Sequence, residues 1–390
     1  MSDEKIIVYA GHLKNAIIIV MSSVYIRNAV YDYASLRPVI FELMEILDRD
    51  LIKTQTRVLI KPNLLAASPP DQAVITHPNI IKAVAAYVIE KGAVPVISDS
   101  PAVSSFERIL QIGGIAEALK GMNVQFAEFK RPLKVDVGRP FNSIEISAEA
   151  MEADVLINLP KLKTHTQMLL TLGVKNLFGC ILGRTKPEWH LRAGVDREMF
   201  ATLLVRIFGA LKPQINILDG ILAMQGEGPG KSGEPRELGI VMGSDNAAAL
   251  DITVSKMFGM QEGSLLTSRI AEKEGLVSGP ITIEGELPLI NDFKFPEMAE
   301  MVFGPAFFHN MIRKHLVQRP VCSDKLCRLC GECWDYCPAK AIKRKQNKLV
   351  FDYEKCIRCY CCLEVCPYGA LKTYETVPGK LARKILKFES

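Results

Sequence analysis

The sequence predicts two structural units of different class. The first is α/β, with an open, mostly parallel sheet and flanking helices, and the second is a small C-terminal α+β domain. Short β-branched runs alternate with segments of helical periodicity over the first 290 residues, which is typical of parallel α/β architecture. Nine of the 11 cysteines lie between residues 327 and 366. A chain of 390 residues is long enough for two or three folding units.

The first predicted elements alternate strand, helix, strand. Residues 58–60 form a β-branched run that ends in Lys61-Pro62-Asn63. Thr76-His77-Pro78 begins a helix, because proline fits the first helical turn, and Gly92 ends it. Residues 94–97 form the next strand, which ends in Ser98-Asp99-Ser100-Pro101.

The same patterns continue to about residue 290. Between residues 291 and 320 they loosen into a segment with three prolines, which we interpret as a connector. Helices are predicted over residues 36–48, 105–112, 198–211 and 247–258, and strands over residues 154–159, 216–218 and 238–242.

Polar side chains follow most of the predicted strands at the point where each strand ends. In open α/β sheets the ligand crevice lies beyond the carboxyl ends of the strands, so these residues predict a binding site. The alternative is that they are ordinary loop residues, since loops are polar in any protein. The set consists of Lys61, Asn63, Asp99, Ser100, Lys161, Lys163, His165, Asp219, Ser244 and Asp245.

The richest part of this set is Pro160-Lys161-Leu-Lys163-Thr-His165. Lysine anchors a carboxylate or phosphate as a point charge, and histidine can transfer a proton near neutral pH. We therefore predict that His165, Lys163 and Lys161 are catalytic. The alternative is a solvated basic loop with a capping histidine. We expect Lys61, Asn63, Asp99, Ser100, Lys175 and Asn176 to bind the substrate, with Thr171, Lys186 and His190 as further members.

The segment 226–233, Gly-Glu-Gly-Pro-Gly-Lys-Ser-Gly, contains Gly-Lys-Ser but is not a phosphate-binding loop. That motif requires a glycine where this chain has Gln225, and a helix after it, whereas Pro235 and a strand-like run follow here. We interpret the segment as a glycine-rich loop between strands that can approach a ligand closely. Nucleotide hydrolysis is not supported.

Two cysteine runs with identical spacing dominate the C-terminal part. Each reads Cys-x2-Cys-x2-Cys-x3-Cys-Pro, and every position recurs 29 residues later. This is the pattern of bacterial-type ferredoxins with two 4Fe-4S clusters, in which the fourth cysteine of each run binds the other cluster. The second domain is therefore predicted to be ferredoxin-like. One cluster is assigned to Cys327, Cys330, Cys333 and Cys366, and the other to Cys356, Cys359, Cys362 and Cys337.

Other uses of these cysteines fit less well. Structural zinc sites draw on two separated cysteine or histidine pairs with a longer spacer. A disulfide framework belongs to small exported domains, and no export signal is visible in this sequence. Three cysteines, Cys180, Cys322 and Cys361, lie outside the assignment, and a bystander thiol is the usual role of such residues.

Charge and hydropathy narrow the functional class. Residues 321–390 hold 14 Lys and Arg against 8 Asp and Glu, a balance of +6. The whole chain has a net charge of +5, so its positive charge belongs to this C-terminal part. No basic stripe with stacking aromatics predicts nucleic-acid binding. No apolar run is long enough for a transmembrane segment, so we expect a cytoplasmic protein. An electron-transfer module implies a redox partner protein, and the basic strand ends imply a small anionic molecule.

The motifs of the first domain resemble the family known as domain of unknown function 362. Members of that family are commonly fused to a two-cluster ferredoxin, so the resemblance implies an α/β domain with redox work, without naming a reaction. Two differences are visible: Gln225 stands where the family often has an acidic residue, and Met21-Ser-Ser-Val-Tyr resembles the usual family start. The matching segments are 61–65, 76–78, 99–101, 160–165, 174–179, 219–221, 226–233 and 249–251.

Five segments follow from these patterns. Residues 1–20 are expected to be an N-terminal extension, 21–290 the α/β domain of unknown function, and 291–320 the connector. Residues 321–375 are expected to form the ferredoxin domain with two 4Fe-4S clusters, and 376–390 a basic C-terminal tail.

Three functions remain open at this point. The leading hypothesis is an oxidoreductase in which electrons pass from the two clusters to a small anionic substrate or cofactor in the α/β domain. The second is a non-catalytic electron-relay and docking module for a partner oxidoreductase. The third is a non-redox enzyme with structural or regulatory clusters. No flavin fingerprint is visible.

Overall fold

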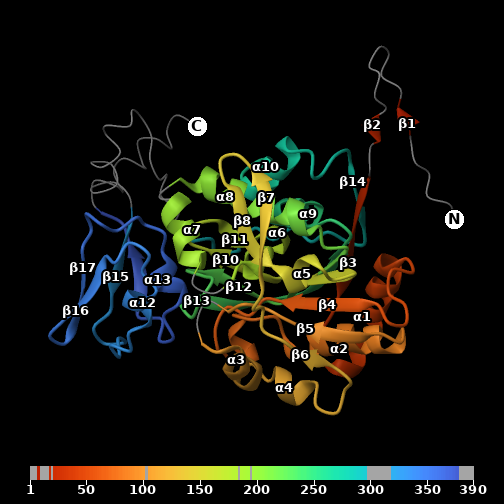
Figure 1. The fold of residues 1–390 in the computed structure, drawn as a ribbon, viewed down its shortest axis with the longest axis horizontal. Helices are drawn as coiled ribbons and strands as arrows, with labels where there is room; N and C mark the ends of the chain where they lie inside the picture. The colour runs from red at the N-terminus through yellow and green to blue at the C-terminus, as the bar shows by residue number, and fades with distance from the viewer. Residues whose placement is uncertain are drawn as a thin grey trace.

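The computed structural model describes residues 7–8, 17–18, 21–101, 104–182, 185–193, 196–296 and 318–376. An α/β domain makes up the larger part of the molecule, and a small cysteine-rich domain lies against one side of it, next to α7, β10 and β13 (Figure 1). The sequence-based fold class is confirmed. The predicted extension, connector and tail lie mostly outside the described residues.

One ten-stranded sheet forms the centre of the large domain, and most of its neighbouring strands are parallel. The strand order is β14-β3-β13-β12-β9-β4-β5-β6, with β10 paired to β12 and β11 outside this path. The strands are β3 Ser22–Asn28, β4 Arg57–Pro62, β5 Val94–Ile97, β6 Gln125–Phe126, β9 Val155–Leu159, β10 Lys161–His165, β11 Leu169–Thr171, β12 Ile215–Gly226, β13 Gly233–Ser244 and β14 Ile281–Glu284.

Helices cover both faces of this sheet (Figure 1). Alternation along β4 explains why both faces are apolar: Val58 and Ile60 pack into the core beneath α1 and α2, while Leu59 packs into the opposite core. The helices are α1 Tyr33–Asp48, α2 Pro78–Glu90, α3 Phe106–Ile112, α4 Ile115–Ala118, α5 Ala148–Met151, α6 Gly173–Asn176, α7 Thr185–Ala193, α8 Arg197–Leu211, α9 Ala247–Met257 and α10 Leu266–Lys273.

The remaining elements are short. A hairpin of β7 (Pro132–Gly138) and β8 (Asn142–Ser147) stands apart from the main sheet, as does the pair β1 (Ile7–Val8) and β2 (Ile17–Ile18). Single 3-10 turns occupy Pro70–Gln72 and Leu177–Cys180. The small domain contains β15 Arg319–Cys322, α12 Glu332–Asp335, β16 Ile342–Lys345, β17 Lys348–Phe351, α13 Cys361–Glu364 and β18 Leu371–Tyr374.

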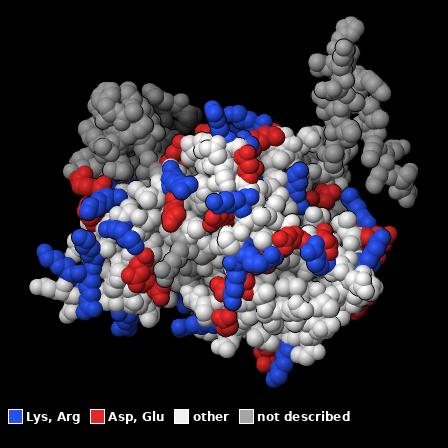
Figure 2. Space-filling view, in the orientation of Figure 1, with Lys and Arg blue, Asp and Glu red and all other residues white. Residues whose placement is uncertain are grey.

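The small domain repeats its local structure as the cysteine pattern repeats. Each run places a one-turn helix, α12 or α13, between two of its cysteines, and two antiparallel pairs, β15–β18 and β16–β17, frame them. Exposed Lys343, Arg344, Lys345 and Lys348 on β16 and β17 give its outer face a basic character (Figure 2). The positive charge of this part of the sequence is therefore displayed at the surface.

The glycine-rich loop 226–233 is where the small domain contacts the sheet. Ser232 donates a hydrogen bond to the carbonyl of Leu371 (3.2 Å), and Thr373 donates one to Glu227 (3.0 Å). A Cβ atom on Gly230 would lie 3.0 Å from the carbonyl oxygen of Glu364, so glycine permits the close approach. The sequence predicted that this loop can approach a ligand closely. In the structure its close contacts are with the second domain of the same chain.

Two expectations for the sheet were wrong. Residues 161–165 are not a loop but the buried strand β10, held by β11 and β12. Ser244 and Asp245 do not join the other strand ends, because β13 runs antiparallel to β12 and Ser244 pairs with Asn216 near the start of β12. The segments predicted as short strands at 216–218 and 238–242 are parts of the twelve-residue strands β12 and β13.

Candidate functional site

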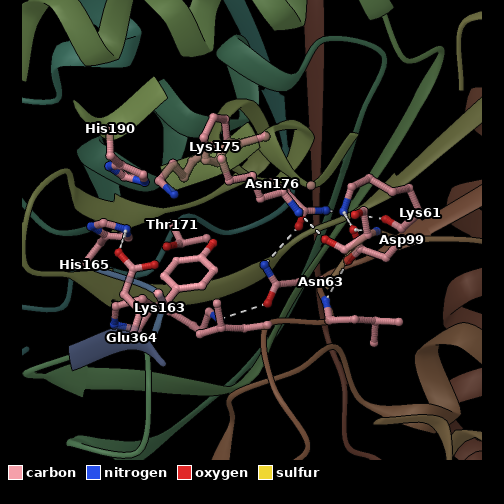
Figure 3. A pocket seen from close by; sticks show the side chains of 18 residues that line it. Lys61, Asn63, Asp99, Lys163, His165, Thr171, Lys175, Asn176, His190 and Glu364 are labelled. Atoms are coloured by element: carbon pink, nitrogen blue, oxygen red, sulfur yellow. Dashed lines mark hydrogen bonds and ion pairs between the residues drawn. The ribbon is translucent and has the colours of Figure 1, made fainter. Parts of the chain in front are cut away.

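A cavity of about 70 Å³ lies where the two domains meet. Its walls combine residues at or after the ends of β4, β5 and β10 with residues of α6 and α7 and two residues of the small domain (Figure 3). Lysines, histidines, carboxylates and amides line it: Lys61, Asn63, Asp99, Ser100, Lys163, His165, Thr171, Lys175, Asn176, Lys186, His190, Tyr336 and Glu364, with Leu64, Leu65, Phe178, Gly179 and Pro229.

One ion pair joins the ends of β4 and β5 at this cavity. The Lys61 ammonium lies 3.0 Å from Asp99 Oδ1, and both side chains are buried. Asp99 also accepts hydrogen bonds from the backbone N–H groups of Leu64 (3.0 Å) and Ser100 (2.8 Å). Because parallel neighbours β4 and β5 end at the same edge of the sheet, residues far apart in sequence meet here.

The Lys61–Asp99 ion pair leaves no room for a side chain at Gly179. A Cβ atom there would lie 2.4 Å from Lys61 Nζ and 2.5 Å from Asp99 Oδ1, which no real Cβ contact allows. The glycine of the family-like segment 174–179 thus allows the turn after α6 to pack directly against the pair.

Gly179→Ala is therefore expected to displace Lys61 from Asp99 and to destabilise the fold by about 1–3 kcal/mol, the usual cost of overpacking. Thermal unfolding measures the loss. Cys180→Ala is the control, because it removes a buried side chain next to Gly179 and adds no atom at the ion pair. Unchanged stability in Gly179→Ala would contradict the contact.

A network of amides holds the base of the cavity. Lys163 Nζ donates to Asn63 Oδ1 (2.9 Å) and to the carbonyl of Val74 (2.8 Å). Asn63 donates to Asn176 Oδ1 (2.9 Å), and Asn176 donates to Asn158 Oδ1 (2.8 Å). The Lys163 ammonium therefore has neutral hydrogen-bond partners, and its charge is not neutralised by a bonded carboxylate.

His165 links the cavity to the small domain. Its Nδ1 accepts hydrogen bonds from the backbone N–H groups of Gln167 (3.1 Å) and Met168 (3.2 Å), so the ring proton sits on Nε2. Nε2 lies 3.1 Å from the carboxylate of Glu364 (Figure 3). Burial, followed by the nearby Lys175, lowers the pKa of His165 to about 4, although Glu364 acts in the opposite direction.

This geometry changes the role expected for His165. The imidazole is neutral at pH 7, and protonation of Nδ1 would break two backbone hydrogen bonds. Proton transfer near neutral pH, as the sequence suggested, is therefore not supported by this arrangement. Burial alone would raise the pKa of Glu364, but His165, Lys175 and His190 together lower it to about 2. Glu364 is thus a carboxylate that faces a neutral histidine.

Several polar groups in the cavity wall are poorly satisfied. Among the described residues, Thr171 Oγ1, His190 Nδ1, His165 Nε2 and Glu364 Oε1 are buried and have no hydrogen-bond partner, although the last two lie 3.1 Å apart. Within the same residues no acceptor is bonded to the Lys175 ammonium, which lies over the rings of Phe178 (5.2 Å) and Phe200 (5.7 Å). Lys186 donates to the carbonyl of Ser100.

Burial disfavours the charged forms of the cavity lysines. It is the largest cause that lowers the pKa of Lys163 to about 7 and that of Lys186 to about 8. The pKa of Lys175 is lowered as well, chiefly by burial. These ammonium groups would gain from an anion, which restores their charge and satisfies their donors.

The structure brings together most residues that the sequence singled out. Lys61, Asn63, Asp99, Ser100, Lys163, His165, Lys175 and Asn176 line the cavity, together with the further members Thr171, Lys186 and His190.

Lys161 is the exception. In the parallel register of β10 and β12 it lies opposite Asp219, and its ammonium forms a buried ion pair with that carboxylate (2.8 Å) and a hydrogen bond to Tyr31 (2.7 Å). It does not line the cavity, so its role is to neutralise Asp219.

Sequence reasoning missed Tyr336 and Glu364. Both belong to the cysteine runs, which were interpreted only as cluster ligands. A weak signal existed, because Glu364 has an acidic counterpart, Asp335, 29 residues earlier in the first run. Asp335 is not in the cavity wall, and only docking of α13 on β10 brings Glu364 to His165.

The eight cysteines of the two runs lie in the small domain in two groups. Cys327, Cys330, Cys333 and Cys366 line one hollow together with Cys322. Burial, and after it the thiols of Cys359, Cys356, Cys333 and Cys337, raises the pKa of Cys362 well above the usual value, so Cys362 lies near the other three members of the second set and also near Cys333 of the first. The spacing assigned Cys366, the last cysteine of the second run, to the cluster of the first run. The hollow agrees with this assignment, because Cys366 lines it together with Cys327, Cys330 and Cys333.

The donor set suits iron–sulfur clusters. Backbone N–H groups donate to the sulfur atoms of Cys327 (3.5 Å), Cys337 (3.3 Å) and Cys366 (3.3 Å), and such hydrogen bonds tune cluster potentials. Among the described residues, no three Cys, His, Asp or Glu side chains converge into a site for a metal ion.

The two groups differ in access to solvent. Cys330 is exposed, whereas Cys359 and Cys362 are buried near the cavity side of the domain. Tyr336 and Glu364 line the cavity; Tyr336 is next to Cys337, and Glu364 lies between Cys362 and Cys366 in the sequence. Burial, and after it Cys361, Glu364 and Cys359, raises the pKa of Tyr336, so Cys359 of the second group lies near the cavity wall.

In the described part of the chain, no helix combines the length and the apolar character that a membrane span requires.

Comparison with known proteins agrees with this division. Residues 58–256 match the family model described as domain of unknown function 362, and residues 326–370 match a 4Fe-4S dicluster domain. A thylakoid-associated protein from Synechocystis is 37% identical over 70% of this chain and 87% of its own length. A pyruvate synthase subunit PorD from Methanocaldococcus jannaschii is 33% identical over 14% of this chain and 63% of its own length.

Among solved structures, the apoprotein of a lactate racemase from Thermoanaerobacterium thermosaccharolyticum is similar with a TM-score of 0.38 and 13% identity, covering 63% of this chain and 60% of that one. The family and the iron–sulfur domain expected from the sequence are confirmed.

Proposed function

The chain belongs to the domain of unknown function 362 family, and on that premise we propose that it is an iron–sulfur redox enzyme. Two 4Fe-4S clusters, with the ligand sets given above, supply one-electron transfer. Electrons from a redox partner protein pass to a small anionic substrate or cofactor held in the interdomain cavity. We place the protein in the cytoplasm, where reducing conditions keep the cysteine ligands available.

One observation carries this proposal. The cationic cavity of the α/β domain is closed by Tyr336 and Glu364, which come from the cysteine runs themselves. An anion in the cavity would therefore lie beside the group of Cys356, Cys359, Cys362 and Cys337. An electron-transfer domain that merely accompanied a separate site would not need to form part of its wall.

The residues of the chain divide the work. Lys163, Lys175 and Lys186 bind the anion by charge, and Asn63 and Asn176 fix the position of Lys163. His165 is a positioning residue that holds Glu364 at the cavity wall. The rings of Phe178 and Phe200 limit the entry of water around Lys175. The exposed Cys330 marks the side at which a partner would deliver electrons.

The experiment is a stoichiometric reoxidation assay. The anaerobically reconstituted protein is reduced with limiting dithionite, and a panel of small carboxylic and phosphorylated acids is added while the cluster absorbance is followed. We expect one class of acids to reoxidise the clusters of the wild type and to fail with Lys163→Met, because this change removes a cavity cation.

Lys273→Met is the matched control, because Lys273 is exposed on α10 and outside the cavity. Iron content should be equal in all three proteins. If no acid reoxidises the clusters while an added ferredoxin does so readily, the non-catalytic relay module is the correct function.

A further inference from the structure

We propose that the cavity selects a compact oxyanion that carries two negative charges, such as a short dicarboxylate with a reducible double bond. The inference rests on the function proposed above and specifies the charge and size of its ligand. Three independent properties of the cavity support it: volume, formal charge and unsatisfied donors.

The volume sets the size. The cavity volume of about 70 Å³ is several times the roughly 10–15 Å³ that one water molecule needs, so the cavity admits a small molecule. A compact ligand that carries its charge on a few atoms suits this space.

The formal charge of the wall sets the charge of the ligand. Four lysines (Lys61, Lys163, Lys175 and Lys186) stand against two carboxylates (Asp99 and Glu364), which leaves two positive charges. The Lys61–Asp99 pair neutralises itself. Glu364 faces a histidine whose proton is fixed on Nε2, so this contact does not add a cation. A dianion balances the surplus, whereas with a monoanion one of the buried lysines has no counter-charge and its neutral form is favoured.

Among the described residues, the Thr171 hydroxyl and Nδ1 of His190 are unsatisfied groups that can act as hydrogen-bond donors. The Lys175 ammonium, which lies over the ring of Phe178, is a further donor. Glu364 Oε1 and His165 Nε2 also lack a hydrogen bond, but they face each other at 3.1 Å. A ligand that satisfies the three donors must present several acceptors, as carboxylate and phosphate oxygens do. Figure 3 shows Lys175 and His190 toward one end of the cavity and Lys61 with Asp99 toward the other. The unsatisfied donors thus lie toward the end away from the Lys61–Asp99 pair.

Isothermal titration calorimetry on the reconstituted full chain tests the proposal with malonate and phosphate as dianions and acetate and formate as monoanions. We expect dianions to bind at least about tenfold more tightly, since charge-assisted hydrogen bonds are the strong ones. Lys175→Met should weaken malonate about tenfold to a hundredfold. Glu364→Gln should strengthen it, because the change adds to the positive surplus, and Lys273→Met should leave it unchanged.

Proton uptake gives a second readout. Lys163 is surrounded by Lys175, Lys161, Asp99 and Glu364, and Lys186 by Asp99, Lys61, Cys180 and Lys175. With pKa values of about 7 and 8, both lysines lose charge as the pH rises through this range. At pH 8 a bound dianion restores the charge, so binding should take up protons, and malonate titrations in buffers of different ionisation enthalpy measure the number. Lys163→Met should reduce the uptake.

The outcomes separate the two proposals. Equal affinity for monoanions and dianions, or dianion binding without proton uptake at pH 8, overturns the assignment of a dianion but leaves the redox function standing. Tight dianion binding with no reoxidation of the clusters by any acid supports the ligand class and overturns the redox role of the cavity. Absence of binding by all four anions overturns the ligand class directly.

Discussion

Replacement of Cys362 by serine is expected to remove the cluster that faces the cavity and to abolish reoxidation by a cavity ligand. Cys362 is buried among Cys359, Cys356 and Cys337, and a cubane requires a thiolate at each corner. Iron should fall from about eight to about four atoms per chain after anaerobic reconstitution. Iron and sulfide determination, with EPR of the reduced protein, measures the loss.

Neighbouring cysteines supply the controls. Cys361→Ser and Cys322→Ser should retain all iron, because neither residue belongs to a ligand set. Cys330→Ser should also retain about four irons per chain but lose the solvent-facing cluster, so that dithionite can still feed the cavity-side cluster while a protein donor cannot. Full iron content in Cys362→Ser, or fewer than about seven irons in the wild type, contradicts the ligand assignment.

Local sequence signals predicted the core of the fold well. The bounds of β4, α2 and β5 follow from β-branched runs, from Pro78 in the first turn of a helix and from Gly92 after its last. Strand β10 was missed because Lys161, Lys163 and His165 are residues of a typical polar loop. Its extended conformation depends on β11 and β12. Its lysines tolerate burial because Lys161 pairs with Asp219, and Asn63 and the carbonyl of Val74 accept hydrogen bonds from Lys163.

Most of the polar cavity wall could be predicted from the sequence, for a physical reason. Parallel strands end at one edge of the sheet, so the polar residues after β4 and β5 had to converge. Tyr336 and Glu364 join the wall only because the second domain docks there, and no periodicity records that docking. The sequence indicated that the glycine-rich loop can approach a ligand closely. Only the structure shows that the loop approaches the backbone carbonyl oxygens of Leu363 and Glu364.

The docking contact itself can be tested by enlarging Gly230. Its Cβ position lies 3.0 Å from the carbonyl oxygen of Glu364 and 3.3 Å from that of Leu363, and backbone atoms cannot move aside as a side chain can. Gly230→Leu is therefore expected to push α13 from the loop at a cost of about 1–3 kcal/mol. Glu364 would leave His165, and the cavity would open to water.

Hydrogen–deuterium exchange measures that separation. Amides of residues 360–365 and 163–168 should exchange faster in Gly230→Leu, Gly230→Ala should show a smaller increase, and iron content should stay unchanged. Gly209→Ala is the control, since its added methyl would meet only the flexible side chain of Leu276 (3.3 Å). Reoxidation of the clusters by the cavity ligand should slow in the same order as exchange accelerates. Separation of α13 from the loop would move the cluster bound by Cys362 away from the anion, so electron transfer between them should slow. If exchange accelerates and reoxidation does not slow, the electrons do not pass through this interface.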